Sequence, residues 1–329
     1  MPRSQSRASA CALLTPFGTS GLAPARPLPD IASYDHILIF VSGGKDSIAC
    51  IDAVLAAGAN PAQIELHHHD VDGAGGALMD WPVTASYCRA LAASFGLPLF
   101  TSWKEGGFLR EMLRDNLPTA PIHYQSPSGR HIVGGQGPRN TRLRFPQLSA
   151  DLSVRWCSAY LKIMVADALI RGDDRFLGRR TLVVTGERAE ESPSRARYAT
   201  FEPHRTDTRG GTRRRRHVDH WRPVHRWREA HVWDAMRGHG IVPHVGYQLG
   251  WRRLSCMACI FMSADQAASI RFMAPYVFNA LAGYEQAFGC TIKRGRSIDE
   301  RRGGTGKAKM CRPAPRRARV EPGASGALA

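Results

Sequence analysis

The residues best suited to chemistry stand in one short segment, Ser42-Gly-Gly-Lys-Asp-Ser47. Its two glycines let backbone N–H groups approach an anion closely, and a helix that starts here adds the positive end of its dipole. Lys45 supplies a mobile positive charge, while Ser42 and Ser47 supply hydroxyl groups. We therefore predict that phosphate is held by Ser42, Gly43, Gly44, Lys45, Asp46 and Ser47.

The elements on either side of this segment fit that chemistry. Residues 37–41 form an apolar run of β-formers, which predicts a strand buried on both faces. After the glycines, apolar residues recur at helical spacing, beginning with Ile48 and Ile51. The segment is not a Walker A loop, because Ile39 and Asp46 stand where that motif needs a glycine and a hydroxyl residue.

The composition narrows the class of protein. The chain has 329 residues and is 43% hydrophobic, which is enough for one large α/β domain or two small ones. No apolar run reaches the roughly 18 residues of a membrane span, and no secretory signal is recognisable. Eight scattered cysteines do not form a disulfide scaffold. We expect a cytoplasmic protein with reduced thiols and no membrane contact.

The net charge of +17 is concentrated in three segments. Residues 204–228 contain nine arginines and two aspartates, and residues 303–329 contain six basic residues and one glutamate. Residues 1–33 add three arginines and one aspartate. Such segments usually promote solubility or make weak contact with nucleic acid, so both alternatives remain open here.

The order of patterns along the chain predicts its organisation. We expect a disordered lead over residues 1–33, a nucleotide-binding domain over 34–262, a helical extension over 263–302 and a basic disordered tail over 303–329. Within the domain, segments 118–150 and 204–220 lack periodicity and are expected to be mobile loops.

The fold class follows from alternating strand and helix patterns. Strands are predicted at residues 37–41, 64–70, 97–102 and 181–186, with helical patterns between them. This order predicts a doubly wound, mostly parallel sheet of about five strands with helices on both faces, followed by a cysteine-bearing helical extension. Asp70 ends the second strand, where it is placed to contact a ribose or a metal ion.

The glycine–lysine segment resembles the pyrophosphate loop of the adenine nucleotide α-hydrolase superfamily, which includes ATP pyrophosphatases and phosphoadenosine phosphosulfate (PAPS) reductases. Further resemblances lie in Gly186–Arg195, which is similar to G-x-R-x-x-E-S-x-x-R, and in Trp221–Trp227, which is similar to R-P-[IL]-x-x-W. Tyr247–Cys259 resembles Y-x-x-G-x-x-R-x-x-C-x-x-C. Together they resemble the PAPS reductase family, especially its phage and bacterial PAPS-reductase-like branch.

The resemblance implies an adenine nucleotide substrate, either ATP or adenylyl sulfate/PAPS, with Mg²⁺ as a cofactor. Lys45, Arg188 and Asp46 are the implied catalytic residues, and Asp46 or Asp70 would hold Mg²⁺. A surface salt-bridge network is the structural alternative for the arginines. The nucleotide-binding residues outside the loop would be Asp70, Gly186, Arg188, Glu191, Ser192 and Arg195.

The cysteines raise the question of a bound metal. Cys256-x-x-Cys259 has the spacing by which two thiolates grip one metal. The resemblance implies Cys157 as a third ligand, with Cys290 or His244 as a fourth. Iron–sulfur relatives carry two adjacent cysteines where this chain has Trp156-Cys157. An iron–sulfur cluster (4Fe-4S), structural zinc and no metal therefore remain three alternatives.

Two functions from different classes follow. The first is an enzyme that cleaves ATP between its α- and β-phosphates to adenylate an acceptor, or that uses an adenylyl-sulfate nucleotide in sulfur transfer with an electron donor. The C-terminal E-C-G-x-H segment of thioredoxin-dependent PAPS reductases is absent from this sequence. The second is a nucleotide-dependent, DNA-associated component, acting in phosphorothioation-type modification or nucleotide sensing.

Overall fold

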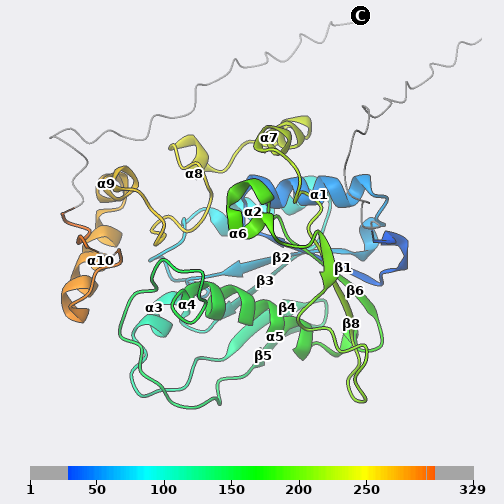
Figure 1. Cartoon of the computed structure of the whole chain (residues 1–329), viewed down its shortest axis with the longest axis horizontal. Helices are drawn as coiled ribbons and strands as arrows, with labels where there is room; N and C mark the ends of the chain where they lie inside the picture. The colour runs from blue at the N-terminus through cyan, green and yellow to red at the C-terminus, as the bar shows by residue number, and fades with distance from the viewer. Residues whose placement is uncertain (1–28, 294, 301–329) are drawn as a thin grey trace, which may run out of the picture.

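A computed structural model describes residues 29–293 and 295–300. Its centre is a sheet of eight strands in the order β5-β4-β3-β2-β1-β6-β8-β7 (Figure 1). Five neighbouring strands are parallel: β3 (Leu99–Lys104), β2 (Ile64–Asp70), β1 (His36–Val41), β6 (Arg180–Val184) and β8 (His217–Trp221). The predicted doubly wound, mostly parallel fold is therefore confirmed.

Three short antiparallel strands extend the sheet at its two ends. The hairpin of β4 (Ile122–Ser126) and β5 (Gly129–Val133) pairs with β3, and β7 (Phe201–Pro203) pairs with β8. The hairpin lies within residues 118–150 and the first four residues of β8 lie within 204–220, so the prediction that both segments are loops was wrong in these parts. Their polar outward residues and short length hide the alternation that marks a strand.

Helices cover both faces of the sheet (Figure 1). One face packs on α1 (Lys45–Ala56), α2 (Thr84–Phe95) and α7 (Glu229–Gly238), and the other packs on α5 (Met164–Gly172). Alternate residues of β1 supply both cores, since successive strand side chains point to opposite faces. Ile37 and Ile39 enter the first core, and Leu38 enters the second.

The helix that begins at Trp156 is continuous but irregular. It starts as α4 (Trp156–Ser158), passes through one π-helical turn, η3 (Ala159–Ile163), and continues as α5. Such turns often occur at functional sites, because they change the direction of the side chains that they carry. The other short helical elements are η1 (Ile31–Ser33), η2 (Pro61–Gln63), α3 (Gly107–Met112), η4 (Asp174–Phe176), η5 (Ala189–Glu191), α6 (Pro193–Ala196) and α8 (Val245–Gln248).

The predicted C-terminal extension consists of α9 (Ala264–Met273) and α10 (Pro275–Phe288), which pack on each other and on the segment that carries the cysteine pair. Within the described residues, no helix is both long and apolar enough to cross a membrane. Most of the predicted lead and all of the predicted basic tail lie outside the described residues, as do Cys11 and Cys311.

The strand order creates one special position in the sheet, between β1 and β6. From β1, the chain proceeds through β2 and β3 on one side and later through β6 and β8 on the other. The carboxyl ends of β1 and β6 therefore flank a topological switch point, where open α/β sheets bind ligands. The two motifs that follow these strands, at Ser42 and at Gly186, meet at this crevice.

Candidate functional site

The glycine–lysine loop has the predicted strand–turn–helix form. β1 ends at Val41, and α1 begins at Lys45 with Gly44 as its N-cap. Gly43 has a φ of +72°, and a Cβ atom there would lie 3.0 Å from the ring of Tyr87. The N-cap residue Gly44 makes no side-chain cap hydrogen bond, so the N–H groups of the first turn need partners from outside the helix.

Gly186 brings the second motif against the loop. A Cβ atom at this position would lie only 2.7 Å from the carbonyl carbon of Asp46 and 3.0 Å from the amide nitrogen of Ser47. Glycine is therefore required for β6 to deliver the chain so close to α1. This close approach joins two motifs that are separated by about 140 residues in the sequence.

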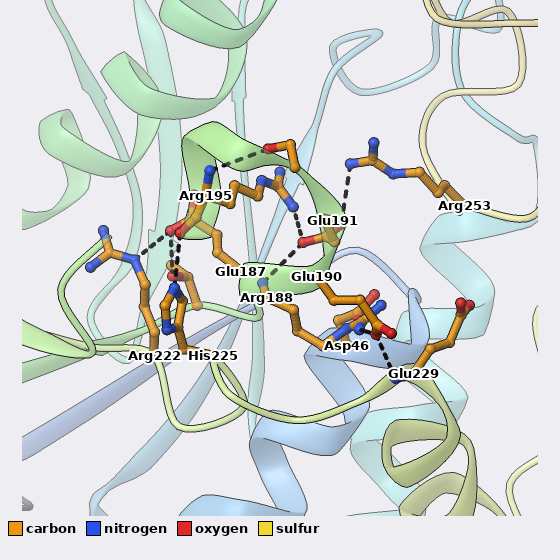
Figure 2. A network of polar contacts seen from close by, with 12 residues as sticks. Asp46, Glu187, Arg188, Glu190, Glu191, Arg195, Arg222, His225, Glu229 and Arg253 are labelled. Atoms are coloured by element: carbon orange, nitrogen blue, oxygen red, sulfur yellow. Dashed lines mark hydrogen bonds and ion pairs between the residues drawn. The ribbon is translucent and has the colours of Figure 1, made fainter. Parts of the chain in front are cut away.

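Arg188 is the side chain through which the second motif contacts the loop (Figure 2). Its side chain is 3% exposed; Nε pairs with Asp46, and Nη1 lies 2.6 Å from Glu190 Oε2. Burial lowers the pKa of Arg188, but the contacts with Asp46 and Glu190 outweigh this effect and raise the pKa overall. The guanidinium is therefore a permanent charge at the start of α1.

Lys45 lies in the same charged cluster. Its Nζ atom is 3.1 Å from Asp46 Oδ2 and 3.4 Å from Glu229 Oε1, and it faces the rings of Trp233 and Tyr247 at 5.9 and 5.7 Å. The backbone N–H of Lys45 donates to the Tyr247 hydroxyl at 3.1 Å. Glu229, Trp233 and Tyr247 were not predicted as site residues.

Glu191 organises the rest of the predicted motif. One carboxylate oxygen accepts from the backbone N–H of Arg188 at 3.0 Å and pairs with Arg195, and the other lies 3.1 Å from Arg253 (Figure 2). Ser192 caps α6 by accepting from the N–H of Arg195. The predicted residues are brought together, and Arg253 joins them from the segment before the cysteine pair.

The two serines of the loop have different surroundings. Ser47 is buried, and its hydroxyl donates to the Gly44 carbonyl at 2.8 Å, which fixes the first turn of α1. Ser42 is exposed at the start of the loop. Ser42 therefore has the hydroxyl that is open to a ligand, whereas the Ser47 hydroxyl supports the shape of the loop.

Asp70 organises the loop that follows β2. Its carboxylate accepts from the backbone N–H groups of Asp72, Gly73 and Ala74 at 2.9 to 3.1 Å. Asp72 in turn accepts from the N–H groups of residues 78–80, and burial raises the pKa of Asp72 to about 6. Both carboxylates thus order the backbone of residues 70–80.

A cavity of about 190 Å³ lies beside this loop. Its lining residues are His68, Asp70, Asp72, Gly75, Gly76, Ala77, Asp80, Trp81, Pro82, Thr84 and Ala85. His68 contacts the carbonyl of Val41 at 3.0 Å, which places the cavity next to the end of β1. The cavity and the glycine–lysine loop are therefore neighbouring parts of one crevice.

His244 lies between the cavity and the glycine–lysine loop. Its Nδ1 accepts from the N–H of Gly246 at 3.1 Å and caps α8, while its ring contacts Trp81 and Tyr87. Burial lowers the pKa of His244 to about 4. The neutral ring is thus a structural element of the crevice wall.

The three predicted metal ligands, Cys157, Cys256 and Cys259, all act electrostatically on Lys162, an exposed residue of η3. Cys256 is the main cause of a raised Lys162 pKa, and Cys259 and Cys157 act in the same direction. Burial raises the pKa of Cys157 and of Cys256. Across residues 29–293 and 295–300, however, no group of three or more His, Cys, Asp or Glu residues is arranged to hold a metal ion.

The arginine-rich segment lies at the other edge of the sheet, where β8 begins. The Gly178 N–H, which precedes β6, donates to the Arg215 carbonyl at 2.9 Å. Most of its ion pairs are internal to the fold: Arg205 pairs with Asp167, Arg209 with Asp207 and Asp219, Arg214 with Asp174, and Arg222 with Glu187 and Glu202. Much of its positive charge is therefore neutralised by the protein itself.

Comparison with known families gives a match for one part of the chain. Residues 146–262 match the family model of the phosphoadenosine phosphosulfate reductase domain. The match includes the Gly186–Arg195 motif, Arg253 and the three cysteines. The predicted resemblance to the PAPS reductase family is confirmed for this segment, and the glycine–lysine loop Ser42–Ser47 lies outside the match.

Two individual proteins are similar to the chain. An uncharacterized 37.8 kDa protein from the gpa 5′ region of Escherichia phage 186 is 32% identical over 160 residues, which cover 47% of this chain and 43% of the phage protein. The chain thus matches less than half of that relative. A crystal structure of phosphoadenylyl-sulfate (PAPS) reductase from Candida auris, a phosphate complex, is 13% identical with a TM-score of 0.39; the match covers 70% of this chain and 85% of that one.

Proposed function

We propose that the chain binds an adenine nucleotide, ATP or adenylyl sulfate/PAPS, with its phosphates in the glycine–lysine loop. The observation that carries the proposal is the meeting of two buried cations, Lys45 and Arg188, at the start of α1. Backbone N–H groups, a helix dipole and two fixed charges together favour a phosphate group. The switch point between β1 and β6 is also the expected place for a ligand in this fold.

The cavity beside β2 supports a place for the rest of the nucleotide. Its volume of about 190 Å³ and its mixed lining, with the Trp81 ring beside polar groups, suit a base or a ribose. Asp70 lines this cavity, but the backbone hydrogen bonds of its carboxylate favour a structural role. Asp46 is therefore the better candidate for contact with a Mg²⁺ ion that accompanies the phosphates.

The reaction would take place at the adenylyl phosphate. Either ATP is cleaved between its α- and β-phosphates to adenylate an acceptor, or an adenylyl-sulfate nucleotide takes part in sulfur transfer with an electron donor. In both cases Lys45 and Arg188 would offset the charge that develops on the leaving oxygen. Catalysis would depend on positioning and electrostatics, as in other phosphoryl transfers.

The alternative of a DNA-associated component has weaker support. Arg205, Arg209 and Arg214 already face carboxylates, and the segment that carries them lies at the edge of the sheet away from the crevice. Duplex-DNA binding that falls steeply with salt, and that weakens when residues 204–228 are neutralised, would favour this alternative.

Substitution of Lys45 tests the proposal. We expect Lys45→Ala to weaken ATP binding at least about 30-fold, because a charge-assisted hydrogen bond of roughly 2 kcal/mol is lost. Isothermal titration calorimetry of the full chain with Mg²⁺ and ATP measures this change. Arg179→Ala is the control, since Arg179 is exposed at the other end of β6. Unchanged affinity in Lys45→Ala would contradict the loop assignment.

A further inference from the structure

A second group of cations lies at the carboxyl edge of the sheet, outside the proposed nucleotide site. Lys104 is the last residue of β3, Arg114 follows α3, and Arg142 comes from the long segment after β5. Their charged groups lie over one ring, that of Tyr160, at 5.3, 5.7 and 4.5 Å from its centre. The π-helical turn η3 carries this tyrosine.

One carboxylate serves both arginines. Glu111 Oε1 lies 3.1 Å from Arg114 and 2.9 Å from Arg142, and Oε2 accepts from the Thr119 hydroxyl at 2.9 Å. Lys104 has neutral partners, donating to Thr119 at 2.7 Å and to the Ala120 carbonyl at 3.4 Å. Among the described contacts, this cluster therefore has two more positive than negative charges.

The excess charge is also withdrawn from water. Lys104 is fully buried, Glu111 is 1% exposed, and the side chains of Arg114 and Arg142 are each 7% exposed. The Nε–H groups of both arginines are buried and have no hydrogen-bond partner among the described residues. Uncompensated buried charge and unpaired donors are both costly, and an anion at this position would relieve both costs.

We propose that Lys104, Arg114 and Arg142 form a second anion-binding site, which takes a dianionic oxyanion group, phosphate or sulfate. A double negative charge matches the excess of the cluster. Several acceptor oxygens match the unpaired Nε–H groups and the Lys104 ammonium, because guanidinium groups bind oxyanions through parallel N–H donors. The site does not depend on nucleotide binding, since it shares no residue with the glycine–lysine loop.

Protonation of Lys104 links the site to pH. Burial lowers the pKa of Lys104 to about 8; Glu111 opposes this shift, and Arg114, Arg142 and Arg110 reinforce it. The ammonium is therefore present at pH 7 and mostly lost at pH 9. Affinity for the anion should fall about tenfold over this interval, and a Lys104→Met chain should show no such fall.

Equilibrium dialysis of the full chain with radiolabelled sulfate tests the site at pH 7. We expect one sulfate to remain bound in Lys45→Ala, and also in the wild-type chain when ATP is saturating. We expect that sulfate to be lost in Lys104→Met and in Arg142→Met. Lys104→Met removes a charge without a carboxylate partner, so the variant should stay folded, which urea unfolding will confirm.

Three results would overturn the site: wild-type sulfate binding in both methionine variants, no sulfate in Lys45→Ala, or displacement of every sulfate by ATP. Failure of the nucleotide proposal has a different signature. In that case ATP would not bind, yet Lys104→Met would still remove a sulfate that Lys45→Ala retains.

Discussion

Two cationic clusters lie at the same edge of the sheet, and they differ in how their charge is balanced. At the end of β1, Lys45 and Arg188 face Asp46, Glu190 and Glu229. At the end of β3, Arg114 and Arg142 share Glu111, and Lys104 has no carboxylate partner among the described contacts. The pKa of Arg188 is raised by its ion pairs, whereas burial lowers the pKa of Arg142.

The two clusters would therefore bind an anion in different ways. In the first cluster, Glu190 and Glu229 are about half exposed, so they can turn away when a phosphate arrives. In the second, the sole carboxylate is buried, and an anion would add to it rather than replace it. Without a ligand, carboxylates of the protein neutralise the cations of the first cluster, whereas the second cluster keeps an excess of positive charge.

The largest expected effect comes from removing the buried carboxylate. Glu111→Gln should lower the free energy of unfolding by about 3–5 kcal/mol, because two buried arginines lose the only carboxylate that they contact among the described residues. Urea unfolding measures this loss. Glu105→Gln is a matched control, since Glu105 also pairs with an arginine but is 46% exposed, and it should change stability by less than about 1 kcal/mol. Equal effects in the two variants would show that the second cluster is not short of negative charge.

Arg188 should contribute next most, through binding rather than stability. Arg188→Ala should weaken ATP binding by about 2 kcal/mol, roughly 30-fold, because a fixed guanidinium is lost from the start of α1. Calorimetric titration gives the value. Arg237→Ala is the control, because Arg237 lies exposed on α7 in an ion pair with Asp234. If both variants bound ATP like the wild type, Arg188 would belong to a structural salt-bridge network only.

The stability of the protein should fall in acid because of His244, which lies between the glycine–lysine loop and the cavity. His244 has a folded pKa of about 4, below the usual 6.5, so the stability from its neutral form is present at pH 7 and is lost as the pH falls. Between pH 7 and pH 5 this loss should be about 2 kcal/mol. His244→Asn can keep the cap of α8 but cannot titrate. A stability profile as steep in this variant as in the wild type would exclude His244 as the cause.

The smallest expected effect on ATP binding comes from Glu229, whose carboxylate pairs with Lys45 in the first cluster. Glu229→Gln should strengthen ATP binding about two- to fivefold, because Lys45 loses a competing carboxylate that is 49% exposed and hence worth less than about 1 kcal/mol. Calorimetry with Mg²⁺ and ATP measures the gain, and Asp234→Asn on the same helix is the control. Weaker binding in Glu229→Gln would indicate that this carboxylate takes part in holding the nucleotide.

Much of the fold could be predicted because buried parallel strands are apolar throughout. The runs at 37–41 and 181–184 have this character, and both strands formed where they were expected. β8 was missed because its residues His217, Asp219 and His220 are polar. Asp219 and His220 are nevertheless buried, because distant residues supply their partners: the Tyr34 hydroxyl contacts Asp219 at 2.8 Å, and Thr185 contacts His220 at 2.8 Å.

The residues of the site likewise fall into two groups: those that a local sequence pattern predicts, and those that only the folded chain brings together. The loop Ser42–Ser47 is a contiguous pattern, so its geometry could be predicted from spacing alone. Glu229 and Tyr247 reach Lys45 from about 180 and 200 residues further along the chain, and no local pattern indicates such contacts. The second cluster was missed for this reason, since β3, α3, the segment after β5 and η3 each contribute one or two residues.

The most direct test of the account is a comparison of ATP, AMP and adenosine as ligands of the wild-type chain in the presence of Mg²⁺. If the loop after β1 holds the phosphates, calorimetry should show one ATP per chain and affinities that fall at least about tenfold from ATP to AMP and again from AMP to adenosine. Equal affinity for ATP and adenosine, or no binding of ATP, would contradict the central claim that this loop is a nucleotide phosphate site.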